Sequence, residues 1–247
     1  MFYEIRMNYF SVLIALANVF CSMVVNADPV VELFTSQGCY SCPPADEHLA
    51  EIIEKYPHVV ALEFHVDYWD DLHYGAAGVW KDPFSSPAYT ARQQIYNSHD
   101  LLGKKGVYTP QMIVNGNIAF VGSNRDILDE ALGEWPPEVN IEAEFSDNQL
   151  AVDITSDYKD GAILWLAIFD RLHVTEVPRG ENHGKTITNH NVVRELIPIG
   201  EWEGNAVSAS FKMTKLNHSP EAENTGCAVL LQGVKLGQIV GASYCNE

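Results

Sequence analysis

The chain has few basic residues, and this scarcity excludes two classes of partner. It contains 15 Lys and Arg against 33 Asp and Glu, so its formal net charge is −18 over 247 residues. Such an acidic chain is repelled by nucleic-acid phosphates and by anionic lipid headgroups. We therefore exclude nucleic acid and anionic membrane surfaces as partners, and interpret the acidic residues as a soluble surface.

Long apolar runs are scarce as well, and the one that exists lies in the first 27 residues. Arg6 supplies a positive charge, residues 9–25 are almost all apolar or small, and residues 25–27 (VNA) form an acceptable cleavage site. This pattern predicts a secretory signal peptide over residues 1–27. The alternatives are an uncleaved anchor and a lipoprotein attached at Cys21. No later run is long enough to span a membrane, so we expect a periplasmic or extracellular protein without membrane-spanning segments after cleavage.

Cysteine is also rare: after signal removal the chain keeps Cys39, Cys42, Cys227 and Cys245. An even number of cysteines in an exported protein is typical of proteins that form disulfides in an oxidising compartment. A hairpin centred on Leu236 would place Cys227 opposite Cys245, within reach of a structural disulfide. The chain has no second C-x-x-C, so a zinc site would need the distant cysteines or histidines to converge on the first pair.

The order of predicted elements divides the chain into two parts. Residues 28–135 read as strand, helix, strand, helix, hairpin and helix, which predicts an α/β thioredoxin-like domain with the C-x-x-C after its first strand. Residues 135–137 (WPP) resemble a linker. Residues 138–247 contain about seven strand-like runs without helices, which predicts a second, all-β sandwich-like domain.

Cys39 and Cys42 carry the main chemical signal. They lie where the strand at 30–35 gives way to a helix opened by Pro43 and Pro44. A helix N-terminus favours the thiolate of the first cysteine, and the second is close enough to resolve a mixed disulfide. We predict that Cys39 is the nucleophile and Cys42 the resolving cysteine. The alternatives are an inert structural disulfide and a metal site.

Three further residues are candidates for supporting this pair. The Thr109–Pro110 step opens a later strand, at the position of the cis proline in the expected fold, where backbone could hold a substrate strand beside the sulfurs. The Thr109 hydroxyl could bond near them, although strand preference alone explains a threonine there. Glu32, on the strand leading to Cys39, could relay a proton to the resolving thiol or could be a surface residue.

A polar and aromatic cluster follows the second predicted strand. It comprises His65, Asp67, Tyr68 and Trp69, and sites in open α/β sheets gather at that edge. We predict a substrate-binding lip there, with a packed loop over the core as the alternative. His183 and His190 sit on loops of the second half, where hydrogen-bonded structural roles are more common than metal binding. We assign no metal ligand and no cofactor.

Several long motifs are similar to one known family. The chain resembles the secreted family catalogued as domain of unknown function 1223, which implies a thioredoxin-like domain followed by a β-rich domain in exported bacterial proteins. The motifs that carry the resemblance are 31–39 (VELFTSQGC), 41–46 (SCPPAD), 64–70 (FHVDYWD), 81–84 (KDPF), 92–93 (RQ), 107–112 (VYTPQM), 180–182 (GEN) and 190–194 (HNVVR).

We therefore expect an exported thiol–disulfide oxidoreductase that acts on protein or small-molecule thiols and works with a redox partner. Two alternatives remain open at this stage. One is a non-catalytic envelope binding protein in which Cys39–Cys42 is a structural bridge. The other is a copper or zinc chaperone that uses both cysteines and a histidine such as His65, because soft thiolates favour Cu(I).

Overall fold

The computed structural model describes residues 27–134, 137–155, 158, 160–213, 215–234 and 237–246. The signal peptide predicted at 1–27 therefore lies, apart from Ala27, outside the described residues, as do Trp135 and Pro136 of the expected linker. In the described part no helix is both long and apolar enough to cross a membrane.

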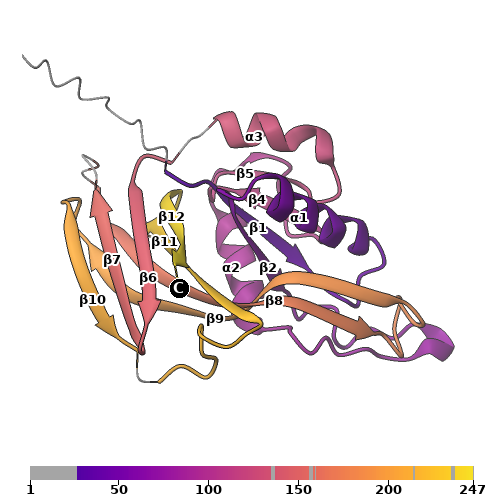
Figure 1. Cartoon of the computed structure of the whole chain (residues 1–247). Helices are drawn as coiled ribbons and strands as arrows, with labels where there is room; N and C mark the ends of the chain where they lie inside the picture. The colour runs from indigo at the N-terminus through magenta and orange to yellow at the C-terminus, as the bar shows by residue number, and fades with distance from the viewer. Residues whose placement is uncertain are drawn as a thin grey trace, which may run out of the picture.

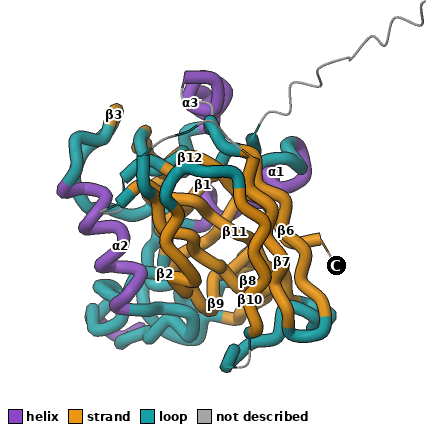
Figure 2. Tube along the Cα trace, turned by 90° about the vertical axis from the view of Figure 1, so that its left-hand side faces the viewer, coloured by secondary structure: helices purple, strands orange, loops and turns teal. Residues whose placement is uncertain are grey.

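Strands dominate the structure (Figures 1 and 2), and all twelve strands of the described residues belong to one sheet. Its order is β10-β7-β6-β12-β11-β8-β9-β2-β1-β4-β5-β3. The strands are β1 (Val30–Thr35), β2 (Val60–His65), β3 (Leu102–Gly103), β4 (Gln111–Val114), β5 (Ile118–Val121), β6 (Asn140–Ser146), β7 (Gln149–Thr155), β8 (Ala162–Glu176), β9 (Thr186–Trp202), β10 (Val207–Lys212), β11 (Thr225–Gly233) and β12 (Ile239–Asn246).

Three α-helices lie outside the sheet: α1 (Pro43–Lys55), α2 (Pro87–Ser98) and α3 (Leu128–Glu134), with short 3-10 turns η1 (Gly75–Ala77) and η2 (Arg125–Ile127). The prolines that open α1 occupy first-turn positions, where a missing N–H costs no hydrogen bond. Helix α2 begins after Ser86, whose hydroxyl caps it by accepting a hydrogen bond from the Ala88 N–H at 3.2 Å. The helix ends at Ser98, since His99 is extended.

The central strands are covered on both faces, which explains why every residue of β1 and β2 is buried. Helices α1 and α3 pack on one face, through Leu49, Ile52 and Leu128 against Leu33 and Met112. Helix α2 packs on the other face. Its Tyr89 and Tyr96 belong to the same core cluster as Phe34, Phe64 and Phe169.

The strands after residue 138 also build a core of their own. Alternate residues of β6 and β7 are buried, as in a strand with one solvated face. Their inward side chains, such as Phe145, Leu150 and Val152, pack against Leu166 and Val229 of β8 and β11. The disulfide expected between Cys227 and Cys245 is present and joins β11 to β12.

The predicted fold class, an α/β thioredoxin-like domain followed by an all-β sandwich-like domain, was wrong. The structure is a mostly β protein with a 12-stranded mixed sheet and few helices, and it shows no thioredoxin-like α/β arrangement. The physical reason is that β9 pairs in parallel with β2, Glu63 opposite Val192, so strands from the second half continue the sheet of the first. The domain limits at 135 and 138 stay a prediction.

The longest strands were also underestimated. We expected about seven strand-like runs between residues 138 and 247, but β8 and β9 alone run for 15 and 17 residues and stay paired as far as Glu176 opposite Thr186. The polar segment between 170 and 191 is therefore a two-stranded arm rather than a loop. Figure 1 shows this arm projecting away from β6, β7 and β10, alongside the region where β1 leads into α1.

Candidate functional site

The C-x-x-C cysteines lie in the turn between β1 and α1 and form a disulfide, with Cα atoms 5.4 Å apart. The Cys39 N–H donates to the Ser36 carbonyl at 3.0 Å, and the Cys42 N–H donates to the Cys39 carbonyl at 3.2 Å. Cys42 is the residue at the N-cap of α1. The pair thus sits at the positive end of a 13-residue helix, where a thiolate is stabilised.

The disulfide is shielded from solvent although the residues between the cysteines are not. Both Cys39 and Cys42 are 0% exposed, whereas Tyr40 is 62% exposed. The Ser41 hydroxyl lies 3.4 Å from Cys39 Sγ. Tyr40 therefore presents an exposed aromatic ring between two cysteines that are themselves buried.

The tip of the β8–β9 arm holds the backbone of the C-x-x-C turn. The buried Asn182 amide donates to the Gln37 and Cys39 carbonyls, both at 2.8 Å. The Tyr40 N–H donates to a Glu181 carboxylate oxygen at 2.7 Å. Lys185 Nζ lies 4.0 Å from the centre of the Tyr40 ring and also donates to the Asn182 side chain at 2.8 Å. We call Glu181, Asn182 and Lys185 the clamp.

Sequence reasoning assigned no role to the clamp. The motif at 180–182 (GEN) marked this segment in the sequence, but its contacts with the C-x-x-C turn appear only in the folded structure. Gly180 is required there for two reasons: its φ is +76°, and a Cβ at this position would lie 2.8 Å from Trp80 Cβ. The tip of the arm therefore packs closely on the 67–85 loop as well.

Trp69 links Thr109 to the C-x-x-C turn. The Trp69 indole N–H donates to the Thr109 hydroxyl at 2.8 Å. A Cβ on Gly38 would meet Trp69 Cβ at 3.1 Å, which places Trp69 directly against the residue before Cys39. The Thr109–Pro110 peptide is cis, and Pro110 accepts a hydrogen bond from the Gly122 N–H through its carbonyl at 3.0 Å.

The other members of the predicted lip are engaged elsewhere. Asp67 bonds to Thr90 of α2 through its N–H at 3.0 Å and its carboxylate at 2.5 Å. The Tyr68 hydroxyl donates to Gln93 at 3.3 Å. Trp69 therefore lies against the C-x-x-C turn, whereas Asp67 and Tyr68 fasten the loop to α2.

His65 is the centre of a buried polar network. Its ring nitrogens lie 2.7 Å from Asp82 and 3.1 Å from Glu63, and all three side chains are buried. Burial lowers the pKa of His65, but the charge and hydrogen bond of Asp82, followed by those of Glu63, overcome this and raise it to about 10. His65 is therefore a fixed cation that holds two carboxylates.

The same network reaches the C-x-x-C turn and the arm. Asp82 accepts a hydrogen bond from the Gln37 N–H at 2.7 Å, and Glu63 accepts from Asn189 at 2.6 Å and from the His190 N–H at 2.8 Å. Gln37 in turn donates to Asn189 at 2.9 Å. A buried network with these partners fixes the position of the turn relative to β2 and β9.

Glu32 is buried, but it does not face α1. Its carboxylate accepts hydrogen bonds from Arg92 Nε at 2.7 Å and from the Tyr96 hydroxyl at 2.5 Å, both on α2. Side chains alternate along a strand, so Glu32 and Phe34 face α2 while Leu33 and Thr35 face α1. Both oxygens of Glu32 are therefore occupied on the face opposite the C-x-x-C helix.

Asp46 is a buried carboxyl on the C-x-x-C helix that the sequence analysis passed over. It is 1% exposed and accepts a hydrogen bond from the Thr35 hydroxyl at 2.7 Å. Its second oxygen, Oδ2, is buried with no hydrogen-bond partner among the described residues. In the described part of the chain, no group of three or more His, Cys, Asp or Glu is arranged to hold a metal ion.

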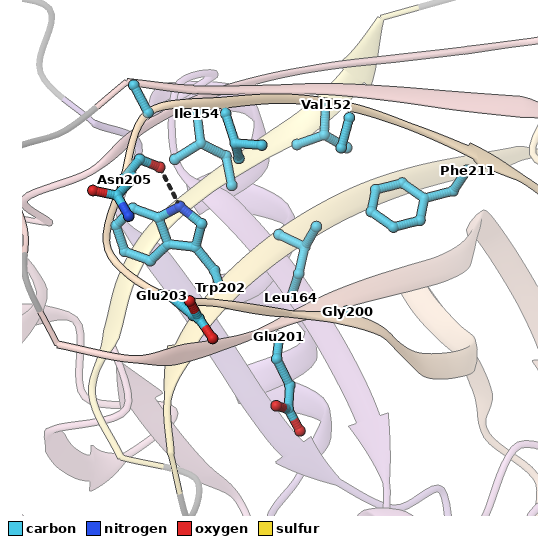
Figure 3. Close-up of a pocket in the computed structure, with 12 residues that line it drawn as sticks. Val152, Ile154, Leu164, Gly200, Glu201, Trp202, Glu203, Asn205 and Phe211 are labelled. Carbon is cyan, nitrogen blue, oxygen red and sulfur yellow. Dashed lines mark hydrogen bonds between the residues drawn. The ribbon is translucent and has the colours of Figure 1, made fainter.

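A cavity of about 330 Å³ opens among β7, β8, β9 and β10 (Figure 3). Val152, Leu164 and Phe211 form apolar walls, and the Trp202 indole donates to the Asn205 carbonyl at 2.6 Å. It lies at the β6–β7–β10 end of the molecule, away from the arm's tip (Figure 1). Its lining residues include two glutamates but no cysteine, histidine or serine, so we assign it no part in the chemistry of the disulfide.

Fold and site together define a mostly β protein with a covered C-x-x-C disulfide at the start of a helix. The chain belongs to the family described as "Protein of unknown function (DUF1223)", whose model matches residues 30–232. The family resemblance predicted from the sequence is confirmed. No curated protein matches the chain.

Two solved structures are similar to this one. The X-ray crystal structure of protein AGR_C_4864 from Agrobacterium tumefaciens has 34% sequence identity and a TM-score of 0.73, covering 90% of this chain and 96% of that one. The structure of HBP35 of Porphyromonas gingivalis has 16% identity and a TM-score of 0.54, covering 89% of this chain and 74% of that one, and shows a likeness of fold alone.

Proposed function

We propose that the protein is an exported thiol–disulfide oxidoreductase that acts on protein or small-molecule thiols through Cys39 and Cys42. The observation that carries the proposal is the Cys39–Cys42 disulfide at the N-terminal end of α1. The helix dipole and the Ser41 hydroxyl beside Cys39 Sγ favour a thiolate on the first cysteine. The −18 net charge favours neutral or basic thiol substrates over acidic ones.

The exchange balances without a cofactor. A substrate thiolate attacks Cys39 Sγ, the S–S bond breaks, and Cys42 Sγ leaves with the electron pair. A second substrate thiolate then attacks the substrate sulfur of the mixed disulfide and releases Cys39 as a thiolate. Two substrate thiols become one disulfide, and the protein disulfide becomes a dithiol. The same steps in reverse reduce a substrate disulfide, with a redox partner restoring the starting state.

The test is the reduction potential of the Cys39–Cys42 pair in the mature protein, measured in glutathione buffers with thiol trapping. We expect a value between about −270 and −120 mV, the span of working exchangers. The Cys227–Cys245 disulfide is the internal control, because a structural bridge should stay oxidised throughout that range. Cys39→Ser must abolish exchange. A potential below about −300 mV, or full activity of Cys39→Ser, would reject the proposal.

A second candidate function has its own supporting observation, which is the complete burial of both cysteines in a turn whose backbone the clamp holds. Under this alternative the disulfide is a structural bridge in a non-catalytic envelope binding protein. It predicts a very negative potential and no reaction with substrate thiols until the protein unfolds. The measurement above separates the two candidates directly.

A further inference from the structure

Because Cys42 is buried, any exchange at this site needs a group of the protein that can give a proton to the Cys42 sulfur and take it back. When the disulfide opens, Cys42 leaves as a thiolate in a position that is 0% exposed. An unpaired charge in such surroundings is costly, and solvent is not in contact to supply a proton. The inference below rests on the proposed function and asks which group of this chain handles that proton.

Asp46 is placed to do so. It lies one helical turn after Cys42, and its N–H donates to the Cys42 carbonyl at 3.2 Å. Side chains four residues apart share a helix face, and each leans toward the helix N-terminus, so the Asp46 carboxyl leans toward Cys42. One oxygen accepts from Thr35, while Oδ2 is buried without a partner.

The other buried ionisable groups nearby are already committed. Glu32 is held by Arg92 and Tyr96 on the far face of β1. Glu63 and Asp82 are bonded to His65 and to backbone or amide N–H groups, as described above. Asp46 is the buried acid with a free oxygen on the helix that carries Cys42.

The protonation state of Asp46 suits this role. Burial raises the pKa of its carboxyl well above the usual range, and the negative charge of Glu63 raises it further. The Thr35 hydrogen bond and the positive charge of His65 act in the opposite direction, and Asp82 adds a smaller upward effect. These groups lie on β1, on β2 and on the loop between β2 and α2. Their net effect is a raised pKa, so the Asp46 carboxyl keeps its proton to a higher pH than an ordinary aspartic acid does.

We propose that Asp46 carries the proton of Cys42 during exchange. As the S–S bond breaks, Cys42 Sγ takes the bonding electron pair and the Asp46 carboxyl gives it a proton, which leaves a carboxylate. In the opposite direction the Asp46 carboxylate takes the proton from the Cys42 thiol. The Cys42 sulfur then attacks Cys39 Sγ of the mixed disulfide and expels the substrate thiolate.

The experiment follows the reduced mature protein, with Cys39 and Cys42 as its free thiols, as it reacts with 4,4′-dithiodipyridine in a stopped-flow instrument. This disulfide is neutral, so the acidic protein does not repel it. Attack by Cys39 releases the first pyridinethione, and attack by Cys42 on the mixed disulfide releases the second. The second phase isolates the step in which the Cys42 thiol loses its proton.

In Asp46→Asn we expect the first phase to change by less than about twofold and the second to slow by about 100-fold near neutral pH, the usual size of general acid–base effects. The difference in second-phase rate between wild type and Asp46→Asn should shrink as pH rises, because the Cys42 thiol then ionises without a carboxylate to take its proton. A second phase that is unchanged at every pH, or slowed equally at every pH, would overturn the proposal.

Thr35→Val provides a second readout that keeps the carboxyl. It removes the hydrogen bond that favours the ionised form, so the pKa of Asp46 rises and the pH midpoint of the second phase should move upward. If Asp46→Asn fails to fold, an unmoved midpoint in Thr35→Val overturns the proposal. A wild-type protein that releases no first pyridinethione rejects the proposed function itself, whereas normal exchange with an unaffected second phase rejects Asp46 alone.

Discussion

The side-chain amide of Asn182 donates a hydrogen bond to the carbonyl of Cys39, a residue 143 positions earlier in the chain, at 2.8 Å. The same amide also holds the Gln37 carbonyl at 2.8 Å. One buried side chain on the β8–β9 arm thus fixes the backbone on both sides of Gly38. We therefore expect the accessibility of the disulfide to depend on a part of the chain that is remote from the C-x-x-C turn in sequence.

Removal of this amide should expose the disulfide. In Asn182→Ala two hydrogen bonds to the C-x-x-C turn are lost, and each contributes about 1 kcal/mol. Local opening of this turn should therefore become at least about tenfold more frequent. We expect the initial rate of reduction by dithiothreitol, followed by thiol trapping, to rise by that factor. His183→Ala is the matched control, because His183 is an exposed neighbour on the same tip. Equal rates in both variants would show that the clamp does not control access.

The buried Glu32–Arg92 pair should be far more important for stability than a surface pair. Arg92→Met leaves a buried carboxylate without its cation, which costs about 3–5 kcal/mol of unfolding free energy. Arg125→Met, which breaks the exposed pair with Glu51, should cost less than about 1 kcal/mol. Urea unfolding measures both. The double variant Glu32→Gln/Arg92→Met should recover stability relative to Arg92→Met, and a further loss would contradict this account.

His65 makes the stability of the protein depend on pH in the alkaline range. Its pKa is about 10 in the folded protein, above the reference value of 6.5, so the folded state binds the proton more tightly than the unfolded state. This contribution is complete below pH 6.5 and is lost as pH rises through about 10. Urea unfolding across that range should show a loss in wild type that is absent from His65→Gln. Parallel curves for the two proteins would refute the locked imidazolium.

The second disulfide should contribute stability without taking part in exchange. Cys227 and Cys245 are 18 residues apart, and closing a loop of this size stabilises a protein by about 3 kcal/mol. We expect Cys227→Ser/Cys245→Ser to lower the unfolding free energy by that amount. The rate at which the protein oxidises a substrate thiol should stay within about twofold of wild type. A large loss of rate in a folded double variant would implicate this bridge in the redox cycle.

The local elements were accessible from the sequence, because their signals are local. Pro43 and Ser86 mark helix starts that the structure contains. The pairing of Glu63 with Val192 was not accessible, since parallel partners far apart in sequence leave no trace in either strand. This pairing is what joins the strands of the first half and the second half into one sheet.

The candidate site was predictable in part for the same reason. The C-x-x-C motif and its helix are contiguous in sequence, so Cys39 and Cys42 could be singled out. The face of Glu32 could not be chosen, because every residue of β1 is buried and the strand shows no alternation. Asp46 looked like an ordinary first-turn acid until the structure showed that it is buried. The clamp could not be predicted, because the sequence does not show that the tip of the β8–β9 arm lies against the C-x-x-C turn.

The late position of the arm in the chain also has a consequence for biosynthesis. A polypeptide is made from its N-terminus, so the C-x-x-C turn exists long before Asn182 is added and can bond to its backbone. During that interval the next cysteine, Cys227, has not yet been made, so Cys42 is the only later cysteine with which Cys39 can pair. The order of synthesis therefore favours pairing of Cys39 with Cys42 before Cys227 and Cys245 become available.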